Sequence, residues 1–185
     1  LDSAGNVYTM GPFSGTVDFD PGPGTYNLTT AGDADIFALK LDSSGSFVWA
    51  QRAGGTSVDQ GRGVAVDSSG AYITGFFSSS ADFGSATVVS AGAGDNFVSK
   101  LDAATGSFGW TRAAAGTDDV AIESGQPIAL DSNGNVITTG HYGGTVDFDP
   151  GPGVTNLTDT GSGARAKRDA TREAAVLNTI TASLE

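Results

Sequence analysis

Apolar side chains occur along this chain in short runs, separated by clusters of glycine, aspartate, asparagine and serine. Short runs rich in valine, isoleucine, threonine and aromatic residues predict β-strands, and the clusters between them predict turns. In the middle of the chain this pattern predicts four successive strands, at residues 63–66, 71–77, 97–101 and 108–112. Glycine-containing turns after residues 66 and 101 join these strands into two antiparallel hairpins.

The same order of segments recurs along the chain, with a spacing of about 65 residues. Self-similarity of this kind indicates an array of repeats. Small changes of length occur only in the turns, where a repeat tolerates them. The recurring blocks are residues 1–7, 66–72 and 130–136 (LDSAGNV, VDSSGAY and LDSNGNV), residues 15–24 and 144–153 (GTVDFDPGPG in both), residues 35–42 and 95–102 (DIFALKLD and DNFVSKLD), and residues 47–52 and 108–112 (FVWAQR and FGWTR).

Each full repeat contains four predicted strands, which we name a to d in chain order. One antiparallel sheet of four strands per repeat is the blade of a β-propeller. The chain supplies strands b, c and d, then a complete set, then a and b, which is a little over two blades, whereas closed propellers have about four to eight. We therefore expect an all-β partial β-propeller over residues 1–161 that belongs to a longer protein or pairs with other copies of itself.

Two segments of the middle repeat carry a resemblance to a known family. Residues 63–75 (GVAVDSSGAYITG) and 95–102 (DNFVSKLD) resemble the hairpin and the following strand of the bacterial SBBP-type β-propeller repeat family. The resemblance extends over residues 1–161 because its parts recur in order. It implies a propeller fold and a secreted or cell-surface setting, and the family has no shared catalytic residues to carry over.

Residues 162–185 depart from the repeat and form a basic tail. The expected third strand c is missing, and residues 164–177 predict a helix by propensity. Apolar residues continue at near-helical spacing up to Leu184. We expect a tail that is helical or disordered. Docking on the open end of the array, association with another copy and disorder all remain open.

Composition excludes several classes of function. The net charge is −12, and the basic residues before the tail are few and scattered. An acidic body without a basic stripe repels nucleic acid and anionic membranes. No apolar stretch is long enough for a membrane span, and the chain has no cysteine, so disulfides cannot stabilise it. The first residue is leucine rather than methionine, which favours an excerpt of a longer protein.

Acidic side chains gather in the long connections between strands b and c and between d and a. We expect these connections to share one end of the blades, where they form an acidic rim. Asp18 with Asp20, and Asp147 with Asp149, are the candidate metal ligands, because two carboxylates two residues apart in an extended run project to the same side and Ca²⁺ prefers oxygen ligands. The simpler interpretation, which we favour, is that these aspartates cap turns, since their spacing matches no known calcium loop.

Aromatic residues allow a second kind of site, because they could stack on a carbohydrate. We favour structural packing instead: Trp49 and Trp110 occupy equivalent places in two repeats and are expected to pack blade against blade. With one histidine and no cysteine, the chain has no set of residues for nucleophilic or metal-dependent hydrolysis.

The sequence therefore predicts a non-enzymatic repeat segment that acts as a scaffold or binding module of an extracellular or surface protein. Its partners would be further blades, other copies of the chain, or a protein or carbohydrate ligand. Two alternatives stay open, a Ca²⁺-dependent carbohydrate-binding module and the non-catalytic part of an exported enzyme.

Overall fold

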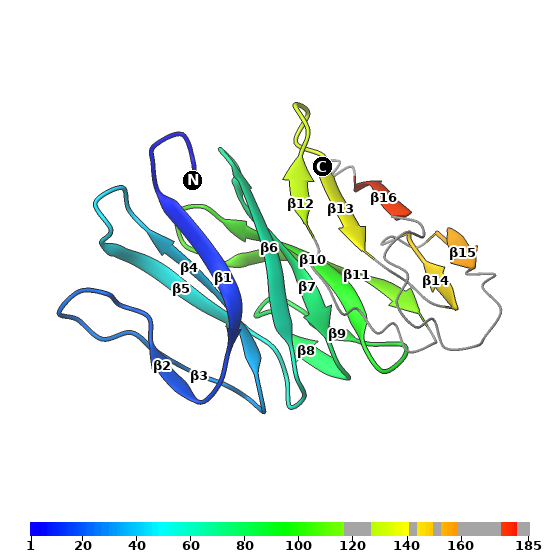
Figure 1. Cartoon of the computed structure of the whole chain (residues 1–185), viewed down its shortest axis with the longest axis horizontal. Coiled ribbons are helices and arrows are strands. Elements are labelled where there is room, and N and C mark those ends of the chain that lie inside the picture. The colour runs from blue at the N-terminus through cyan, green and yellow to red at the C-terminus, as the bar shows by residue number, and fades with distance from the viewer. Residues whose placement is uncertain (117–126, 141–143, 150–152, 159–174, 181–185) are drawn as a thin grey trace, which may run out of the picture.

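The computed structural model describes residues 1–116, 127–140, 144–149, 153–158 and 175–180. All secondary structure among them is β-strand, arranged as three sheets that lie side by side in chain order, with small hairpins between them (Figure 1). This arrangement is the expected partial β-propeller, and each main sheet is one blade. No helix in the described part of the chain could cross a membrane.

The second blade contains the four predicted strands in antiparallel order. They are β6 (Gln60–Asp67), β7 (Gly70–Phe77), β10 (Asp95–Asp102) and β11 (Phe108–Gly116). Each observed strand includes its predicted range and extends it by a few residues. Local alternation and turn glycines were therefore sufficient to place them.

The first blade has strands b, c and d, which are β1 (Val7–Phe13), β4 (Asp35–Leu41) and β5 (Phe47–Ala53). The third blade begins with strands a and b, which are β12 (Ile128–Leu130) and β13 (Val136–Gly140). These assignments agree with the strand order expected from the repeat.

The prediction for the tail was wrong where the structure describes it. Instead of continuing a helix to residue 177, the chain forms strand β16 (Ala175–Ile180), which pairs antiparallel with β13. It takes the place of the strand c that the sequence lacked. The free edge of β13 offers hydrogen bonds that local propensity does not register. Residues 164–174 lie outside the described residues.

Each repeat also carries a hairpin of two short strands between strands b and c, which the sequence did not predict. Strands of three residues bordered by proline and glycine carry too little alternation to be recognised. The hairpins are β2 (Thr16–Asp18) with β3 (Asn27–Thr29), β8 (Ser80–Asp82) with β9 (Thr87–Val89), and β14 (Thr145–Asp147) with β15 (Asn156–Thr158).

Two of these hairpins join a blade to the one before it. Asp82 of β8 exchanges two main-chain hydrogen bonds with Gly54, just after β5, both 3.0 Å long. In the same way β14 pairs with the end of β11, through Ala115 with Asp147 and Gly116 with Val146. The hairpin of one repeat thus continues the last strand of the preceding repeat.

The strand pairing shows that the b strands of the first two repeats correspond with a shift of one residue relative to the alignment of the repeated sequence blocks, which matches Val7 with Tyr72. The a/b turn of the second repeat pairs Asp67 directly with Gly70, whereas in the first repeat the amide of Asn6 bonds the side chain of Asp2 across a turn one residue longer. As a result Tyr72 is the structural counterpart of Tyr8, and each tyrosine pairs with the lysine of its own strand c.

The core lies between the first two blades. One face of the first blade contributes Tyr8, Ile36, Ala38 and Trp49, and the facing side of the second blade contributes Ile73, Phe77, Phe97 and Leu101, with Phe83 from its hairpin. Because most of the apolar burial is between blades, each blade depends on its neighbour for stability.

Candidate functional site

The two proposed calcium pairs lie in separate loops. Asp18 and Asp20 belong to the β2–β3 loop of the first repeat, and Asp147 and Asp149 belong to the matching loop of the third, at the opposite side of the molecule (Figure 1). The structure brings the members of each pair together but not the two pairs. Among the described residues, no three acidic, histidine or cysteine side chains are grouped so as to hold a metal ion.

Asp18 holds its own loop closed. Its Oδ1 atom accepts hydrogen bonds from the amides of Asp20, at 3.0 Å, and Tyr26, at 2.8 Å. These donors, the Tyr26 amide above all, keep the pKa of Asp18 below its usual value. Asp20 in turn accepts the amide of Gly22 at 2.8 Å. One oxygen of each carboxylate is thus committed to main-chain donors of the same loop.

The third repeat uses the same arrangement. Oδ1 of Asp147 accepts the amides of Asp149, at 2.9 Å, and Thr155, at 2.8 Å, and the pKa of Asp147 is lowered by these bonds, the Thr155 bond first. These contacts agree with the turn-capping interpretation of the aspartates. Calcium binding stays a prediction.

The β2–β3 loop is not at the end of the blade where we expected it. A groove of about 380 Å³ lies between residues 20–23 of the loop and residues 44–47 of the turn that joins β4 to β5. The ring of Tyr26 packs against that of Phe47, tilted by 36°, with 4.8 Å between centroids. The expected acidic rim is therefore divided, because the hairpin folds back along the blade and brings its tip to the c/d turn.

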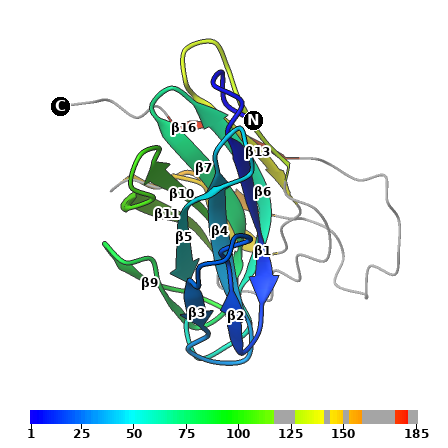
Figure 2. The same cartoon turned by 90° about the vertical axis from the view of Figure 1, so that its left-hand side faces the viewer.

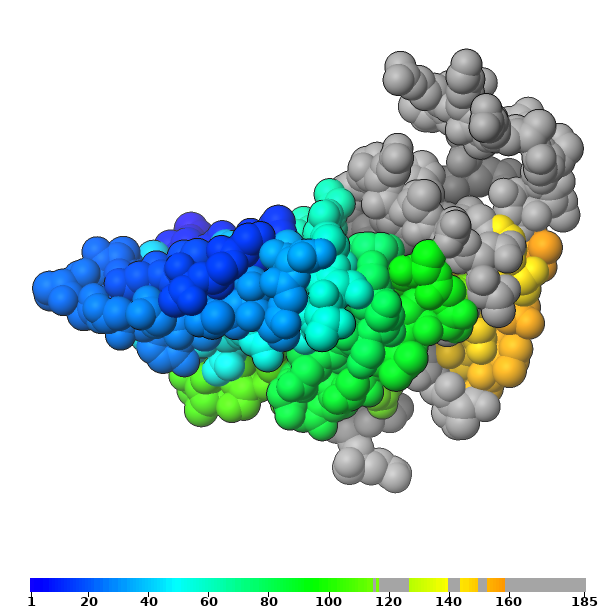
Figure 3. Space-filling model, turned by 90° about the horizontal axis from the view of Figure 1, so that it is seen from below, coloured from blue at the N-terminus to red at the C-terminus, as the bar shows by residue number. Residues whose placement is uncertain are grey.

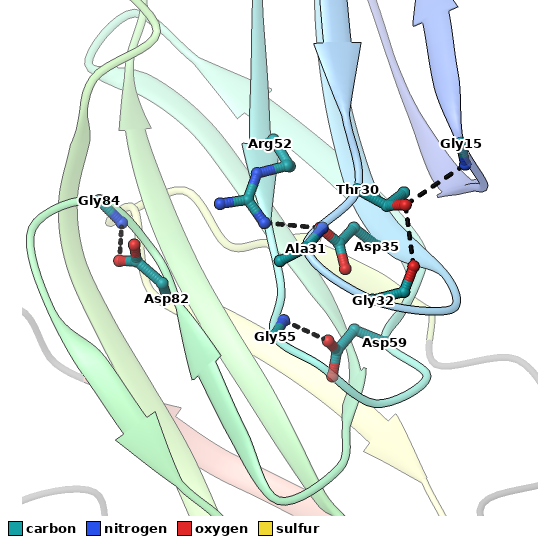
Figure 4. Close-up of polar contacts among 10 residues, drawn as sticks. All are labelled: Gly15, Thr30, Ala31, Gly32, Asp35, Arg52, Gly55, Asp59, Asp82 and Gly84. Carbon is teal, nitrogen blue, oxygen red and sulfur yellow. Dashed lines mark hydrogen bonds and ion pairs between the residues drawn. The ribbon is translucent and has the colours of Figure 1, made fainter.

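A buried charged cluster occupies the other end of the first two blades (Figure 4). Asp35 is fully buried; its Oδ2 atom accepts the Arg52 guanidinium at 2.6 Å and the amide of Ala31 at 2.8 Å, while its Oδ1 atom has no hydrogen-bond partner. An unpaired buried carboxylate oxygen is costly. Among the described residues, Asp35 Oδ1 is the one buried side-chain polar atom without a hydrogen-bond partner.

Asp59 faces Asp35 across Gly54. It accepts the amide of Gly55 at 2.7 Å and that of Ser78 at 3.0 Å. Burial, and to a smaller degree the charge of Asp35, raise the pKa of Asp59 to about 6. A Cβ atom on Gly54 would lie 2.6 Å from Asp35 Oδ1 and 2.9 Å from Asp59 Oδ2, so only glycine fits between the carboxylates.

The second repeat shows what this position does when no arginine is present. Asp95, the counterpart of Asp35, accepts the amides of Ala91, at 2.8 Å, and Gly116, at 3.0 Å, so both of its oxygens are satisfied. In Arg52's place the second repeat has Ala113, which pairs with Phe97 as Arg52 pairs with Phe37. The recurring aspartate therefore ties the start of strand c to strand d, through the Arg52 side chain in the first repeat and through the Gly116 amide in the second.

The sequence analysis did not predict the cluster of Asp35, Arg52 and Asp59. In the sequence Asp35 is the first residue of a repeated block, and Asp59 is an acidic residue of the connection between strands d and a. A signal was present in the repeat itself, since Asp35 and Asp95 recur at the start of a strand that is otherwise apolar.

The tryptophan prediction is confirmed. Trp49 packs edge-on to Tyr8, with centroids 6.0 Å apart, and reaches the second blade by donating its indole N–H to the Ala103 carbonyl at 3.3 Å. Trp110 lies beside Tyr72 at 6.3 Å and packs toward β12 and β13 of the third blade. Equivalent residues thus join successive blades.

Lysine completes this interface. Lys40 is buried, lies 5.0 Å from the centroid of the Tyr8 ring, and donates to the Ala103 carbonyl at 2.7 Å. Lys100 lies 5.3 Å from the Tyr72 ring in the same arrangement. The same three residue types therefore recur on the face of each blade that packs on the next blade. We call this the Tyr–Lys–Trp face; it consists of Tyr8, Lys40 and Trp49 in the first blade and of Tyr72, Lys100 and Trp110 in the second.

Comparison with curated proteins gives a similarity to a long repeat protein. No family model matches the chain. The chain is 32% identical over 155 residues to the Uncharacterized WD repeat-containing protein L264 of Acanthamoeba polyphaga mimivirus, in an alignment that covers 75% of this chain and 11% of that protein. The chain thus spans a small part of a much longer relative. WD repeats form propeller blades, so the similarity agrees with the propeller-type repeat seen in the fold.

Proposed function

We propose that this chain is a non-enzymatic propeller-type repeat segment that works as a scaffold, holding successive blades in a fixed arrangement for the protein to which it belongs. The observation that carries this proposal is the Tyr–Lys–Trp face. Lys40 and Trp49 both donate to one carbonyl oxygen of the next blade, that of Ala103. Burying an ammonium group is costly unless it is partnered. The Lys40 ammonium lies over the Tyr8 ring of its own blade, and it reaches its hydrogen-bond partner, the Ala103 carbonyl, only when the two blades lie in this one arrangement.

The buried acids support the same proposal over an enzymatic one. Asp35 and Asp59 would be the natural pair for acid–base catalysis, since one of them has a raised pKa. Both side chains have no exposed surface, however, and Asp59 is held by two main-chain amides. A substrate cannot reach these carboxylates in this conformation, so their geometry suits a structural junction.

The finer parts of the proposal concern family and setting. We assign the repeat to the SBBP type and place the protein outside the cell or on a bacterial surface. Both parts are supported by the resemblance of residues 63–75 and 95–102 to that family. The similarity to a WD repeat-containing protein supports only the broader propeller class.

The test is the unfolding of the intact chain with and without the Lys40 contact. We expect Lys40→Met to destabilise the chain by about 2 kcal/mol in urea, because it removes a buried charged hydrogen bond, and we expect tryptophan fluorescence and circular dichroism to report one transition. Arg112→Met is the matched control, since Arg112 is an exposed cation on β11. Separate transitions for the blades, or glycosidase turnover that Asp59→Asn abolishes, would overturn the proposal.

A second candidate function, carbohydrate binding, is favoured by the groove beside Tyr26. The groove is lined by Asp20, Ser44, Ser46 and Phe47, among others, and the Tyr26 ring that packs on Phe47 is partly exposed. Such a combination suits a neutral sugar. Calorimetric titration with a panel of neutral oligosaccharides, compared with Tyr26→Ala, tests it; heat that Tyr26→Ala leaves unchanged would exclude this groove.

A further inference from the structure

The front face of the first blade is open only in part, whereas the same face of the second blade is covered. On the first blade Phe13 and Ala50 are buried beside the β2–β3 hairpin, and the exposed part lies at Val7 and Thr9. On the second blade this face carries Ala71, Ile73 and Phe97, each 1% exposed beneath the first blade. The counterparts on the first blade are Val7, which is 36% exposed, Thr9, which is exposed, and Phe37, which is half-buried. Figure 2 shows β1, β4 and β5 with the β2–β3 hairpin from this open side.

The β2–β3 hairpin has an unused edge on the same side. Its Phe19 packs against Phe13 and Phe37, as Phe83 packs against Phe77 and Phe97 in the second blade. Asp82 of β8 is hydrogen-bonded through its main chain to Gly54 of the preceding blade. Asp18 is the counterpart of Asp82, and among the described residues nothing pairs with the outward edge of β2.

The exposed part of the front face and the free edge of β2 lie together at one end of the molecule. Seen from below, the residues of the first repeat form this end, in blue, with the second repeat beside them and the third at the far side (Figure 3). Two junctions within the chain, between the first and second repeats and between the second and third, show what covers such a surface. In both, the preceding repeat supplies a tryptophan-bearing face and the last residues of its strand d.

We propose that the front face of the first blade, with the free edge of β2, is a docking surface for another blade of this same repeat type. The docked blade places a Tyr–Lys–Trp face over Val7, Thr9 and Phe37, and the end of its strand d pairs with β2 at Asp18. Its strand d ends in small residues, because Gly54, Ala115 and Gly116 occupy the paired positions in the two junctions seen.

The shape of the surface favours this occupant over an unrelated protein. Phe13 and Phe37 of the first blade occupy the places of Phe77 and Phe97 in the second blade, whose cover is known. The free edge of β2 also requires an antiparallel strand that pairs at Asp18, next to the apolar face, as Asp82 and Asp147 are paired in the other two repeats. A neighbouring blade satisfies both requirements with the contacts already present twice in the chain.

The experiment adds the expected blade in front of the intact chain. Residues 60–129 are repeated ahead of Leu1, so that the added segment runs into residues 1–7 as it does into residues 130–136 in the natural chain. If the surface is a docking site, the extension raises the melting temperature, and the amide of Asp18 exchanges about tenfold more slowly because it gains a main-chain acceptor, as Asp82 has.

A matched pair of variants separates docking from a general effect of extension. Thr9→Lys places a charge where the covering blade must pack, since Ile73 is buried at that position. Val48→Lys is the control, because its counterpart Gly109 stays exposed in the covered second blade. We expect Thr9→Lys to abolish both effects of the extension and Val48→Lys to leave them.

Unchanged exchange at Asp18 in the extended chain, or equal behaviour of the two lysine variants, would overturn the proposal. The inference rests on the proposed scaffold function, but the two can fail separately. Lys40→Met probes the junction inside the chain, whereas the extension probes only the outer face of the first blade.

Discussion

Trp49 of the first blade donates its indole N–H to the carbonyl oxygen of Ala103 in the second, 3.3 Å away. The ring itself is buried and rests on the turn of the second blade, where Gly106 leaves room for it. Trp49 therefore combines apolar burial with a polar contact at the junction of two blades.

We expect Trp49→Ala to destabilise the chain by about 3–5 kcal/mol, the usual range for removing a large buried aromatic ring. Trp49→Phe keeps most of the ring and loses the hydrogen bond, so we expect a loss of about 1–2 kcal/mol. Urea unfolding followed by circular dichroism measures both. Val48→Ala, at the exposed neighbouring position, serves as control; if it costs as much as Trp49→Ala, the interface does not depend on Trp49.

Ser79 is the one described residue other than glycine with a positive φ, at 60°. It lies in the turn before β8, where the other two repeats have Gly15, with φ of 72°, and Gly144, with φ of 65°. This conformation is unfavourable by about 1–2 kcal/mol for a residue with a Cβ atom, and part of that is offset by the greater freedom of glycine when unfolded. Ser79→Gly is therefore expected to stabilise the chain by about 0.5–1 kcal/mol in thermal or urea unfolding.

The reverse change provides the control for Ser79. Gly15→Ser introduces the same strain in the first repeat, where a Cβ atom meets no neighbour within 4 Å, so steric clash does not contribute. We expect a loss of similar size. Two variants that shift stability in the same direction would show that φ is not the cause.

The sequence was most informative where structure is set locally. Strands β6, β7, β10 and β11 follow from alternation and turn residues, and the blade follows from their recurrence. The short hairpin strands were missed because three residues carry too little alternation, and β8 and β14 are also fixed by pairing with the end of the preceding strand d, at Gly54 and Gly116, which is a non-local property. Strand β16 was missed for the same reason.

The candidate sites divide in the same way. That Asp18 and Asp147 cap their loops could be predicted from the sequence, because each accepts the amide two residues further on, although its second bond reaches eight residues along the chain. The facing of Asp35 and Asp59 could not, since their approach depends on two connections meeting over Gly54. The burial of Asp59 could not be predicted, because it lies in a segment rich in glycine and serine whose composition is that of an exposed turn.

Asp59 makes stability depend on pH. Its pKa is about 6 in the folded chain and near 3.8 when unfolded. Below pH 4 both states hold the proton; between pH 4 and 6 the unfolded chain loses it first, so the folded state loses stability as pH rises. We expect a decline on the order of 2 kcal/mol over this window, with solvent screening allowed for.

Asp59→Asn should remove that decline, because the amide does not titrate. The measurement is the free energy of unfolding in urea at several values between pH 4 and 7, for the wild type and the variant. Asp33→Asn, at an exposed position near Asp35, is the control and should follow the wild type. Parallel curves for the wild type and Asp59→Asn would contradict the role assigned to Asp59.

Asp18 links the stability of the β2–β3 loop to two main-chain amides, those of Asp20 and Tyr26. We expect Asp18→Ala to open the loop, seen as several-fold faster amide exchange at Tyr26 and faster proteolysis within residues 19–26, with the blade strands unaffected. Asp147→Ala should have the same effect at Thr155 in the third repeat. The physical reason in both is the loss of an acceptor that no neighbour replaces.

The same variants separate turn capping from calcium binding. If capping is the role of Asp18, the wild-type loop is equally protected in chelator and in added Ca²⁺, and Asp18→Ala opens it in both. Protection of Tyr26 that appears only with Ca²⁺, together with heat on calorimetric titration that Asp20→Asn removes, would instead assign Asp18 and Asp20 to a metal. Asp33→Asn controls for a general loss of negative charge, since it removes one carboxylate outside the loop.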